Sequence, residues 1–298
     1  MKRIVNGLLV LDKPTGITSR DAVDRVLEWF PRRTKIGHTG TLDPLATGVL
    51  VICLGSATRL ADYVQAMDKV YRTKIVLGAS SDTDDADGTV TPTISAKPQV
   101  AIDETSIREA IGGFIGVIAQ TPPAYSAVKI DGKRAHDLAR RGREVEIAPR
   151  PVQIYGITVL GYTWPELDLE IHCGKGTYIR SLARDLGEKL GSGAYVKELR
   201  RIRVGPFLAE QGATLDDTPS TVDAKLLPPR TAVAHLPVIE ADANSIGQLT
   251  HGQPMATPLD CREIAGTEVA IIDDYGALVG VGCVNDKGET WPVKVLVK

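Results

Sequence analysis

The order of apolar and polar residues near the start of the chain predicts a strand followed by a helix. Residues 4–11 form a mostly apolar run, and residues 12–16 have the composition of a turn. Thr18 or Ser19 can then cap a helix, because apolar residues recur at helical spacing as far as Phe30 and a proline follows.

A long irregular segment separates the next predicted elements. Residues 35–48 combine Gly, Thr and Pro without a helical or a strand period, and this predicts a loop. Residues 49–54 are continuously apolar and predict a buried strand, after which residues 56–66 fit a helix. Residues 71–77 alternate in polarity, so Tyr71 is expected to point inward with the apolar side chains.

The middle of the chain mixes predicted helices and strands without a regular β-α-β order. Residues 80–104 are polar and acidic, which predicts a loop or excursion. The elements predicted after it are a helix over 105–114, an extended segment over 121–130, a turn at 131–132, a short basic helix over 134–141, strands over 145–162 and 167–173, a helix capped by Thr177, and a strand over 194–204. This mixture favours an α+β fold over a doubly wound sheet.

The composition changes towards the end of the chain. From about residue 208 the sequence is acidic and rich in proline, and short β patterns separated by glycine follow. We therefore predict two domains, a larger one over residues 1–235 and a small β-rich one over residues 236–298, which agrees with the usual size of domains.

The overall composition is that of a globular protein. With 298 residues, 43% of them apolar and 24% charged, the chain fits neither a disordered nor a fibrous protein. No apolar stretch approaches the roughly 20 residues that a membrane helix needs, and the apolar start lacks the cleavage site of a signal peptide. We expect a cytoplasmic protein. Its four cysteines show neither C-x-x-C nor zinc spacing, so idle thiols and no metal are expected: Cys53, Cys173, Cys261 and Cys283.

The near-neutral total charge conceals four blocks of alternating sign. Residues 1–80 hold 12 Lys and Arg against 7 Asp and Glu, and residues 121–206 hold 15 against 10. Residues 81–120 hold 2 against 7, and residues 207–298 hold 6 against 13. Two basic blocks in an acidic chain indicate a surface for a polyanion, although two solvated faces without a partner fit the same pattern.

Three segments resemble functional motifs but fail on spacing. The segment Gly174-Lys175-Gly176-Thr177 lacks the Ser or Thr that directly follows the lysine of a phosphate loop. The run over residues 82–88 would place Ile94 where a calcium loop needs Glu, so an acidic loop is expected instead. The H-x-E and P-C-x-x-C pattern of zinc deaminases is absent.

One remaining segment resembles a known family. Residues 37–48, Gly-His-Thr-Gly-Thr-Leu-Asp-Pro-Leu-Ala-Thr-Gly, are similar to the catalytic segment of the TruB-type tRNA pseudouridine synthases, which act on uridine 55 of the T loop. The chain departs from the family at His136, where an aromatic residue is expected, and in its short C-terminal domain. Further similar blocks follow in the family's order across about residues 4–207: Gly7–Pro14, Val70–Arg72, Pro122–Lys129, Lys175–Arg180 and Glu198–Arg201.

The resemblance implies both a fold and a reaction. The fold is a mixed-sheet pseudouridine-synthase domain followed by a small PUA-like β domain. The reaction breaks the N1–C1′ bond of a flipped uridine, turns the base and rejoins it through C5. Because this is an isomerisation, it needs no redox or energy cofactor, and none is expected.

The resemblance also implies a catalytic set. Asp43 supplies the carboxylate at the sugar–base junction, by attack at C1′, by attack at the base or by assisting elimination. Arg180 forms its ion pair, since a cation opposes the rise in pKa that burial causes. Tyr71 stacks on the target base and is a candidate base for the C5 proton. The patterns alone also fit an exposed helix arginine and a core tyrosine.

Other residues are implied to bind the RNA. His38 fills the space that flipped bases leave, Tyr178 and Leu199 line the uridine pocket, and Lys13 supports the catalytic loop or contacts RNA. A polar loop histidine and ordinary core packing are the alternatives. An insertion over about 121–150 is implied to contact the T loop through basic side chains that meet phosphates, including Lys129, Arg134 and Arg141.

The expected partner is therefore the T arm of tRNA, with no membrane, no metal and no obligatory protein partner, for a monomeric enzyme. Two alternatives remain open. One is a pseudouridine synthase for another RNA or within a guide-RNA complex. The other is an RNA-binding folding factor whose catalysis is incidental, although binding alone does not require Asp43, Tyr71 and Arg180. A nucleotide-binding metabolic enzyme is excluded by the lack of a phosphate-loop or dinucleotide motif.

Overall fold

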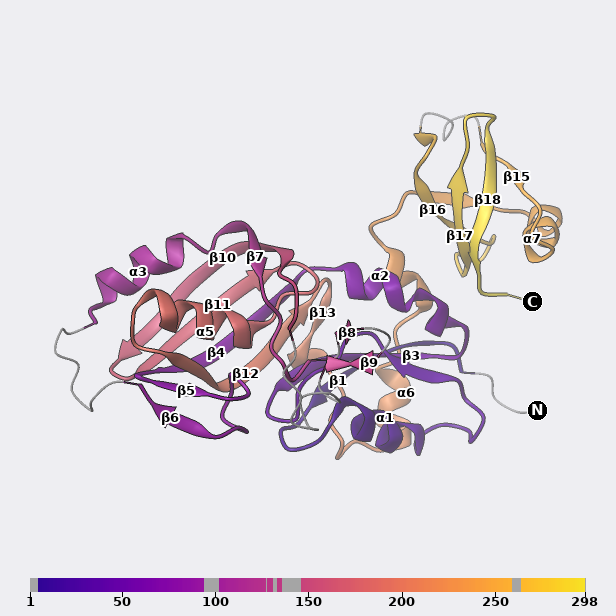
Figure 1. Ribbon diagram of the computed structural model, residues 1–298. Helices are drawn as coiled ribbons and strands as arrows, with labels where there is room; N and C mark the ends of the chain where they lie inside the picture. Colours follow the sequence, from indigo (N-terminus) through magenta and orange to yellow (C-terminus); the bar gives the residue numbers. More distant parts are fainter. Residues whose placement is uncertain are drawn as a thin grey trace.

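The computed structural model shows an α+β protein whose described residues form two large sheets and two two-stranded hairpins (Figure 1). Within the described part of the chain, a nine-stranded mixed sheet occupies the larger part of the molecule and a five-stranded sheet forms the C-terminal end. The model describes residues 5–93, 102–126, 128–130, 133–135, 146–258 and 264–297.

The large sheet has the strand order β1-β3-β12-β4-β11-β10-β7, with β2 paired to β3 and β13 paired to β12. Strand β12 runs parallel to β3, whereas the other described pairs are antiparallel. The strands are β1 (Gly7–Lys13), β2 (Ile36–His38), β3 (Thr47–Leu54), β4 (Lys69–Leu77), β7 (Gly116–Gln120), β10 (Arg150–Thr163), β11 (Glu166–Cys173), β12 (Ala194–Val204) and β13 (Phe207–Leu208).

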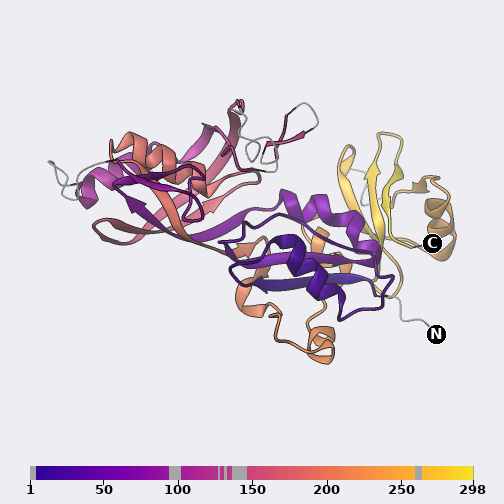
Figure 2. The ribbon, with the colours of Figure 1, turned by 60° about the horizontal axis from the view of Figure 1, so that its bottom comes forward.

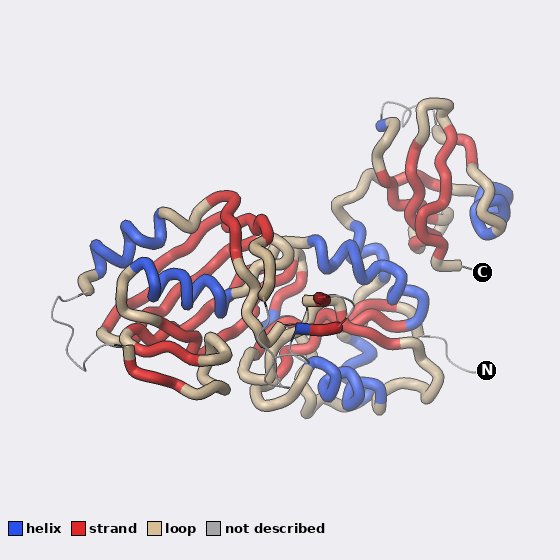
Figure 3. Tube along the Cα trace, viewed as in Figure 1, coloured by secondary structure: helices blue, strands red, loops and turns tan. Residues whose placement is uncertain are grey.

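Alternating side chains explain how this sheet is covered. In β4, Tyr71, Thr73 and Ile75 are buried while Arg72 is exposed, as the alternation predicted. The buried face packs against three longer helices and against Val222 of a short helix, and the main core lies between them and the strands. Figure 3 shows the two helices of the left lobe over one face of the strands. The three helices are α1 (Ser19–Leu27), α3 (Glu104–Gly112) and α5 (Ile179–Lys189).

Helix α1 begins as predicted. The Thr18 hydroxyl accepts from the amide of Asp21, whose carboxylate accepts from the amide of Thr18, and this capping box satisfies donors that a helix start leaves free. The helix ends at Leu27, before Phe30, although Phe30 still packs in the core.

Short elements connect the strands. The predicted helix over 56–66 is divided into a 3₁₀ turn η1 (Gly55–Leu60) and the helix α2 (Ala61–Ala66). The other short elements are the hairpins β5 (Ala79–Ser81) with β6 (Val90–Pro92) and β8 (Lys129–Ile130) with β9 (Lys133–Arg134), the 3₁₀ turns η2 (Ala209–Gln211) and η3 (Pro229–Val233), and α6 (Pro219–Ala224).

Several predicted boundaries are wrong for local reasons. The irregular segment 35–48 begins with β2, which pairs with β3 at the end of that strand. The polar segment 80–104 contains the β5–β6 hairpin, and β7 was not predicted. Thr177 does not cap α5: its hydroxyl donates to the carbonyl of Gly174, and Tyr178 is the N-cap. Arg134 lies in β9, Ala135 after it is helical, and residues 136–141 of the predicted helix lie outside the described residues.

The C-terminal sheet has the order β14-β16-β17-β18-β15 and packs on both faces. Ile239, Leu249 and Val269 belong to a cluster on the side of α7, whereas Ala270 and Val281 join a cluster that includes residues of β1 and β3. The elements are β14 (Val238–Glu240), α7 (Ala243–Thr250), β15 (Met255–Ala256), β16 (Glu268–Ile272), β17 (Leu278–Val284) and β18 (Glu289–Val295). In the described residues, no helix is long and apolar enough to cross a membrane.

The parallel contact between β3 and β12 fixes the place where the 39–46 segment enters the sheet. Gly48 has φ +100° and lies opposite Arg201. A Cβ atom at Gly48 would stand 2.1 Å from the carbonyl oxygen of Arg201. Both the backbone conformation and the close approach therefore require glycine here.

We expect Gly48→Ala to lower the free energy of unfolding by more than about 2 kcal/mol, because strained backbone alone costs roughly 1–3 kcal/mol and the two strands must also separate. Urea unfolding measures this. Gly37→Ala is the matched control, since its new Cβ atom would meet nothing within 4 Å. Equal stability of the two variants would contradict this packing.

Candidate active site

Asp43 lies in the connection between β2 and β3, and side chains from distant parts of the chain hold that connection. The Ser19 hydroxyl donates to the carbonyl of Leu42 at 2.9 Å and accepts from its amide at 2.8 Å. Arg201 donates through Nη2 to the carbonyl of Gly40 at 3.1 Å. The irregular backbone next to Asp43 is thus fixed by buried hydrogen bonds, which compensate for the absence of regular structure.

Lys13 is completely buried and holds the segment next to Asp43 through hydrogen bonds to backbone carbonyls. Its Nζ donates to the carbonyls of Pro14 and Ile17, each at 2.8 Å, and to that of Pro44 at 3.4 Å. Burial lowers the pKa of Lys13 to about 8, against the opposing effect of the Asp43 carboxylate. Of its two predicted roles, this geometry favours support of the loop over contact with RNA.

Arg180 and Asp43 form an ion pair, with Nη2 of the arginine 2.9 Å from Oδ2 of the aspartate. The Arg180 side chain is 5% exposed, whereas the Asp43 side chain is 34% exposed. Arg180 also donates through Nη1 to the carbonyl of Thr83 and through Nη2 to that of Tyr125, both at 3.0 Å. The guanidinium is therefore held in place, and the carboxylate that it contacts remains accessible.

A second carboxylate, which the sequence analysis missed, shares this arginine. Asp85 Oδ2 lies 3.3 Å from Arg180 Nη1, and the Asp85 side chain is 5% exposed. The acidic run over residues 82–88 forms the turn of the β5–β6 hairpin, but Asp85 faces inward. Spacing could have indicated this, because two arginines four residues apart, at 180 and 184, share one face of a predicted helix and need partners.

Burial raises the pKa of the Asp43 carboxyl above its ordinary value. The Arg180 guanidinium opposes the rise and the negative charge of Asp85 adds to it. Arg180 was expected to offset the effect of burial on the pKa of Asp43, and it does so only in part because burial is the larger effect.

Tyr71 and Leu199 lie on neighbouring strands beside this group. Tyr71 is buried on β4, and burial raises the pKa of its hydroxyl, while the nearby Arg201 guanidinium lowers that pKa and the Asp43 charge raises it further. Arg201 is itself buried and donates through Nε to the carbonyl of Val49 at 2.7 Å. Leu199 is a buried core residue of β12.

Tyr178 is placed by the start of α5. Its amide donates to the Gln120 side chain at 2.8 Å, and its carbonyl accepts from the same side chain at 3.0 Å. The ring packs against a small cluster that contains Val128, Ala135 and Ile147. Burial raises the pKa of the Tyr178 hydroxyl, whereas its bond to the Ser126 side chain lowers that pKa.

His38 lies on β2 and is half-buried. Burial, followed by the Arg201 guanidinium, lowers the pKa of its ring, which favours the neutral form. Its Nδ1 atom is buried and has no hydrogen-bond partner within the described residues.

The structure thus gathers part of the predicted site. Lys13, Tyr71, Tyr178 and Arg180 all interact electrostatically with Asp43. The backbones of Lys129 and Arg134 lie in the β8–β9 hairpin, and nothing is described of their side chains; Arg141 and His136 lie outside the described residues.

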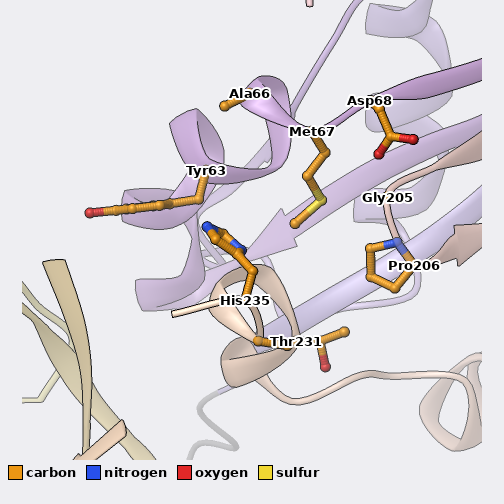
Figure 4. A pocket seen from close by; sticks show the side chains of 9 residues that line it. Tyr63, Ala66, Met67, Asp68, Gly205, Pro206, Thr231 and His235 are labelled. Carbon is orange, nitrogen blue, oxygen red and sulfur yellow. The ribbon is translucent and has the colours of Figure 1, made fainter. Parts of the chain in front are cut away.

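A cavity of about 520 Å³ is lined by nine residues that do not include Asp43 (Figure 4). It lies between α2, the β12–β13 turn and η3, and its lining includes Met67, Pro206 and His235. None of the predicted site residues lines it. Among the residues that the structure describes, no group of three or more His, Cys, Asp or Glu could hold a metal ion.

Comparison with known proteins gives matches along nearly the whole chain. Residues 28–179 match a family model described as TruB family pseudouridylate synthase (N terminal domain), and residues 180–225 match one described as tRNA pseudouridylate synthase B C-terminal domain. The chain is 45% identical over 304 residues to the tRNA pseudouridine synthase B of Ruegeria sp. (strain TM1040), covering 98% of this chain and 96% of that protein. It is 40% identical over 296 residues to the protein of the same name from Chromohalobacter salexigens, covering 98% and 94%.

A solved structure resembles the whole fold. A chain in the crystal structure of a Cbf5-Nop10-Gar1 complex superposes with a TM-score of 0.73 at 28% identity, covering 98% of this chain and 85% of that chain. The likeness therefore includes both the large sheet and the C-terminal sheet.

The raised pKa of Asp43 has a consequence for stability that can be tested on the free protein. Between the ordinary carboxyl pKa of 3.8 and the raised pKa of the folded state, the folded protein binds more protons, so stability falls as the pH rises through that window. We expect Asp43→Asn to raise the free energy of unfolding at neutral pH, with the gain vanishing below pH 3.8.

Urea unfolding between acidic and neutral pH measures this difference. Asp62→Asn is the control, because the Asp62 side chain is 79% exposed and its replacement should change stability little. A variant of Asp43 that is less stable than the parent at neutral pH would contradict the electrostatics described above.

Proposed function

The chain belongs to the TruB family of pseudouridylate synthases, and we propose that it converts uridine 55 in the T loop of tRNA into pseudouridine. Family membership makes it an isomerase, and the expected fold of a mixed-sheet catalytic domain with a PUA-like β domain is confirmed. The name tRNA pseudouridine synthase B, which its relatives carry, supports tRNA as the substrate.

The reaction fixes what the site must supply. The N1–C1′ bond breaks, the base turns, and C1′ bonds to C5; C5 then loses its proton and N1 gains one, so atoms and electrons balance without a co-reactant. The protein must extract the uridine from its loop, place a carboxylate at the sugar–base junction and receive the proton from C5.

The ion pair between Asp43 and Arg180 is the observation that carries this proposal. The carboxylate is accessible to a ligand, and the guanidinium behind it is buried and held by two backbone carbonyls. Such an arrangement keeps a charged group oriented without reorganisation during the reaction. Attack at C1′, attack at the base and assistance of elimination all use a carboxylate in this position.

Tyr71 is proposed to lie against the target base. Because burial raises the pKa of its hydroxyl, the phenol stays protonated at neutral pH, which suits stacking and hydrogen bonding better than proton abstraction by a phenolate. Tyr178 and Leu199 are proposed to complete the walls of the uridine pocket. His38, whose ring favours the neutral form, is proposed to occupy the gap that the extracted bases leave.

The insertion over about 121–150 is proposed to meet the phosphates of the T arm. Its β8–β9 hairpin stands clear of both sheets, where an RNA can reach it (Figure 2). Lys129, Arg134 and Arg141 contribute the positive charge, which predicts binding that weakens with salt.

We further propose that residues 1–235 form the catalytic domain, that residues 236–298 form the PUA-like domain, and that the enzyme acts in the cytoplasm as a monomer without an obligatory protein partner. A synthase for another RNA or within a guide-RNA complex is the main alternative, and one solved structure with the same fold is a Cbf5-Nop10-Gar1 complex. The greater identity to the tRNA pseudouridine synthase B proteins, 45% and 40% against 28%, favours tRNA.

The purified chain, incubated alone with an unmodified tRNA transcript, is expected to form pseudouridine at position 55. Asp43→Asn should lower product formation by about three orders of magnitude or more, because the reacting carboxylate is lost, while the affinity for tRNA stays close to that of the parent. Chemical mapping of pseudouridine and a filter-binding titration measure the two quantities.

Asp62→Asn serves again as the matched exposed control. Pseudouridine formation by Asp43→Asn at the parent rate would refute the role of this carboxylate. Product at other sites of total RNA, with position 55 unmodified, would favour a different RNA substrate.

A further inference from the structure

Arg184 makes a second set of contacts one helical turn beyond Arg180. Its Nη1 lies 3.0 Å from Oδ2 of Asp84, and its Nη2 lies 2.8 Å from Oδ1 of Asp185. The same Nη2 donates to the carbonyl of Thr121 at 3.0 Å. Because residues four apart share one face of a helix, both arginines point at the same two segments of the chain.

Asp84 is the one non-glycine residue with a positive φ in the described part of the chain, at 61°. This left-handed conformation is unfavourable for residues with a side chain, although Asp tolerates it better than most. The Asp84 carboxylate is 14% exposed and is paired with Arg184. The ion pair between Arg184 and Asp84 therefore stabilises a residue whose backbone conformation is unfavourable.

The two neighbours of Asp84 in sequence both contact Arg180. Thr83 offers its carbonyl to Nη1 at 3.0 Å, and Asp85 places its carboxylate 3.3 Å from the same nitrogen. A change of φ at Asp84 would rotate Thr83 and Asp85 relative to each other. The contacts of Thr83 and Asp85 with Arg180 Nη1 therefore depend on the left-handed conformation of Asp84, which Arg184 stabilises.

The second segment is anchored in the same way. The carbonyl of Thr121 accepts from Arg184 and from the Ser181 hydroxyl, which lies at 2.8 Å. Four residues later, the carbonyl of Tyr125 accepts from Nη2 of Arg180. Arg184 thus fixes both segments whose backbone atoms hold the guanidinium against Asp43.

We propose that Arg184 is a positioning residue for the reaction: by holding Asp84 in its left-handed conformation and Thr121 in place, it keeps Arg180 aligned with Asp43. This inference rests on the proposed function. Arg184 acts together with backbone bonds between the hairpin turn and β12, in which Val196 donates to Asp84 and accepts from Ala86. Loss of Arg184 therefore loosens the turn without unfolding the domain.

The test compares single-turnover rates of pseudouridine formation at saturating enzyme, together with tRNA affinity. Arg184→Ala is expected to lower the rate about ten- to a hundredfold, since small misplacements of reacting groups have effects of this order. Affinity for tRNA should remain that of the parent. Adding Asp84→Gly to Arg184→Ala should restore most of the rate, because glycine adopts a φ of 61° without the ion pair.

Arg108→Ala is the matched control, because Arg108 forms an i,i+4 pair with Glu104 on the exposed side of α3. If Arg184→Ala fails to fold, Arg184→Lys, which keeps the charge but cannot bridge Asp84 and Thr121 together, replaces it in the same pair of measurements. The expected loss is then smaller and is again restored by Asp84→Gly.

Two results would overturn the inference: a parent-like rate in the Arg184 variants, or a lowered rate that Asp84→Gly does not raise. Both are separate from a failure of the proposed function, in which the parent chain itself would form no pseudouridine on tRNA.

Discussion

One guanidinium placed between two carboxylates is the interaction on which the rest of the site depends. The two terminal nitrogens of Arg180 form ion pairs with Asp43 and Asp85, and they donate to the carbonyls of Thr83 and Tyr125. A buried arginine that is satisfied in this way has one favourable orientation. With both carboxylates ionised, the group of three carries an excess negative charge, and Asp43 is the member that remains open to a ligand.

Buried cations also shape the backbone around this group. Lys13 and Arg201 donate to main-chain carbonyls, and two of these, those of Gly40 and Pro44, belong to the segment that carries Asp43. Burial of such charges is expensive unless each donor finds an acceptor. The irregular Gly, Thr and Pro sequence before β3 supplies two of those acceptors, and the segment after β1 and strand β3 itself supply the others. The Asp43 carboxylate, whose pKa is raised by burial, is thus held in a fixed place at a cost in stability.

The elements with a clear hydrophobic period could be predicted from the sequence, and so could the site residues in the segments that resemble the family. Strand β12 was predicted with its observed bounds, and Tyr71 was placed on the inward face by alternation alone. The short strands β2, β5 and β7 escaped prediction, since pairing with a neighbour stabilises them more than their own composition does.

Long-range pairing limited the prediction of the site in the same way. Asp43 and Arg180 were matched through the family resemblance, and their contact is present. Asp85 looked like part of a solvated acidic turn, because its neighbours along the chain do not reveal that α5 brings Arg180 against it and Arg184 against Asp84. The order of charges along a chain does not show which of them are buried together, and this decides the electrostatics of the site.

The most direct test of the central claim is the pH dependence of the single-turnover rate of the parent compared with Asp85→Asn. If the negative charge of Asp85 raises the pKa of Asp43, removing that charge moves the acidic limb of the profile to lower pH. An acidic limb that stays in place, or that moves to higher pH, would contradict the account.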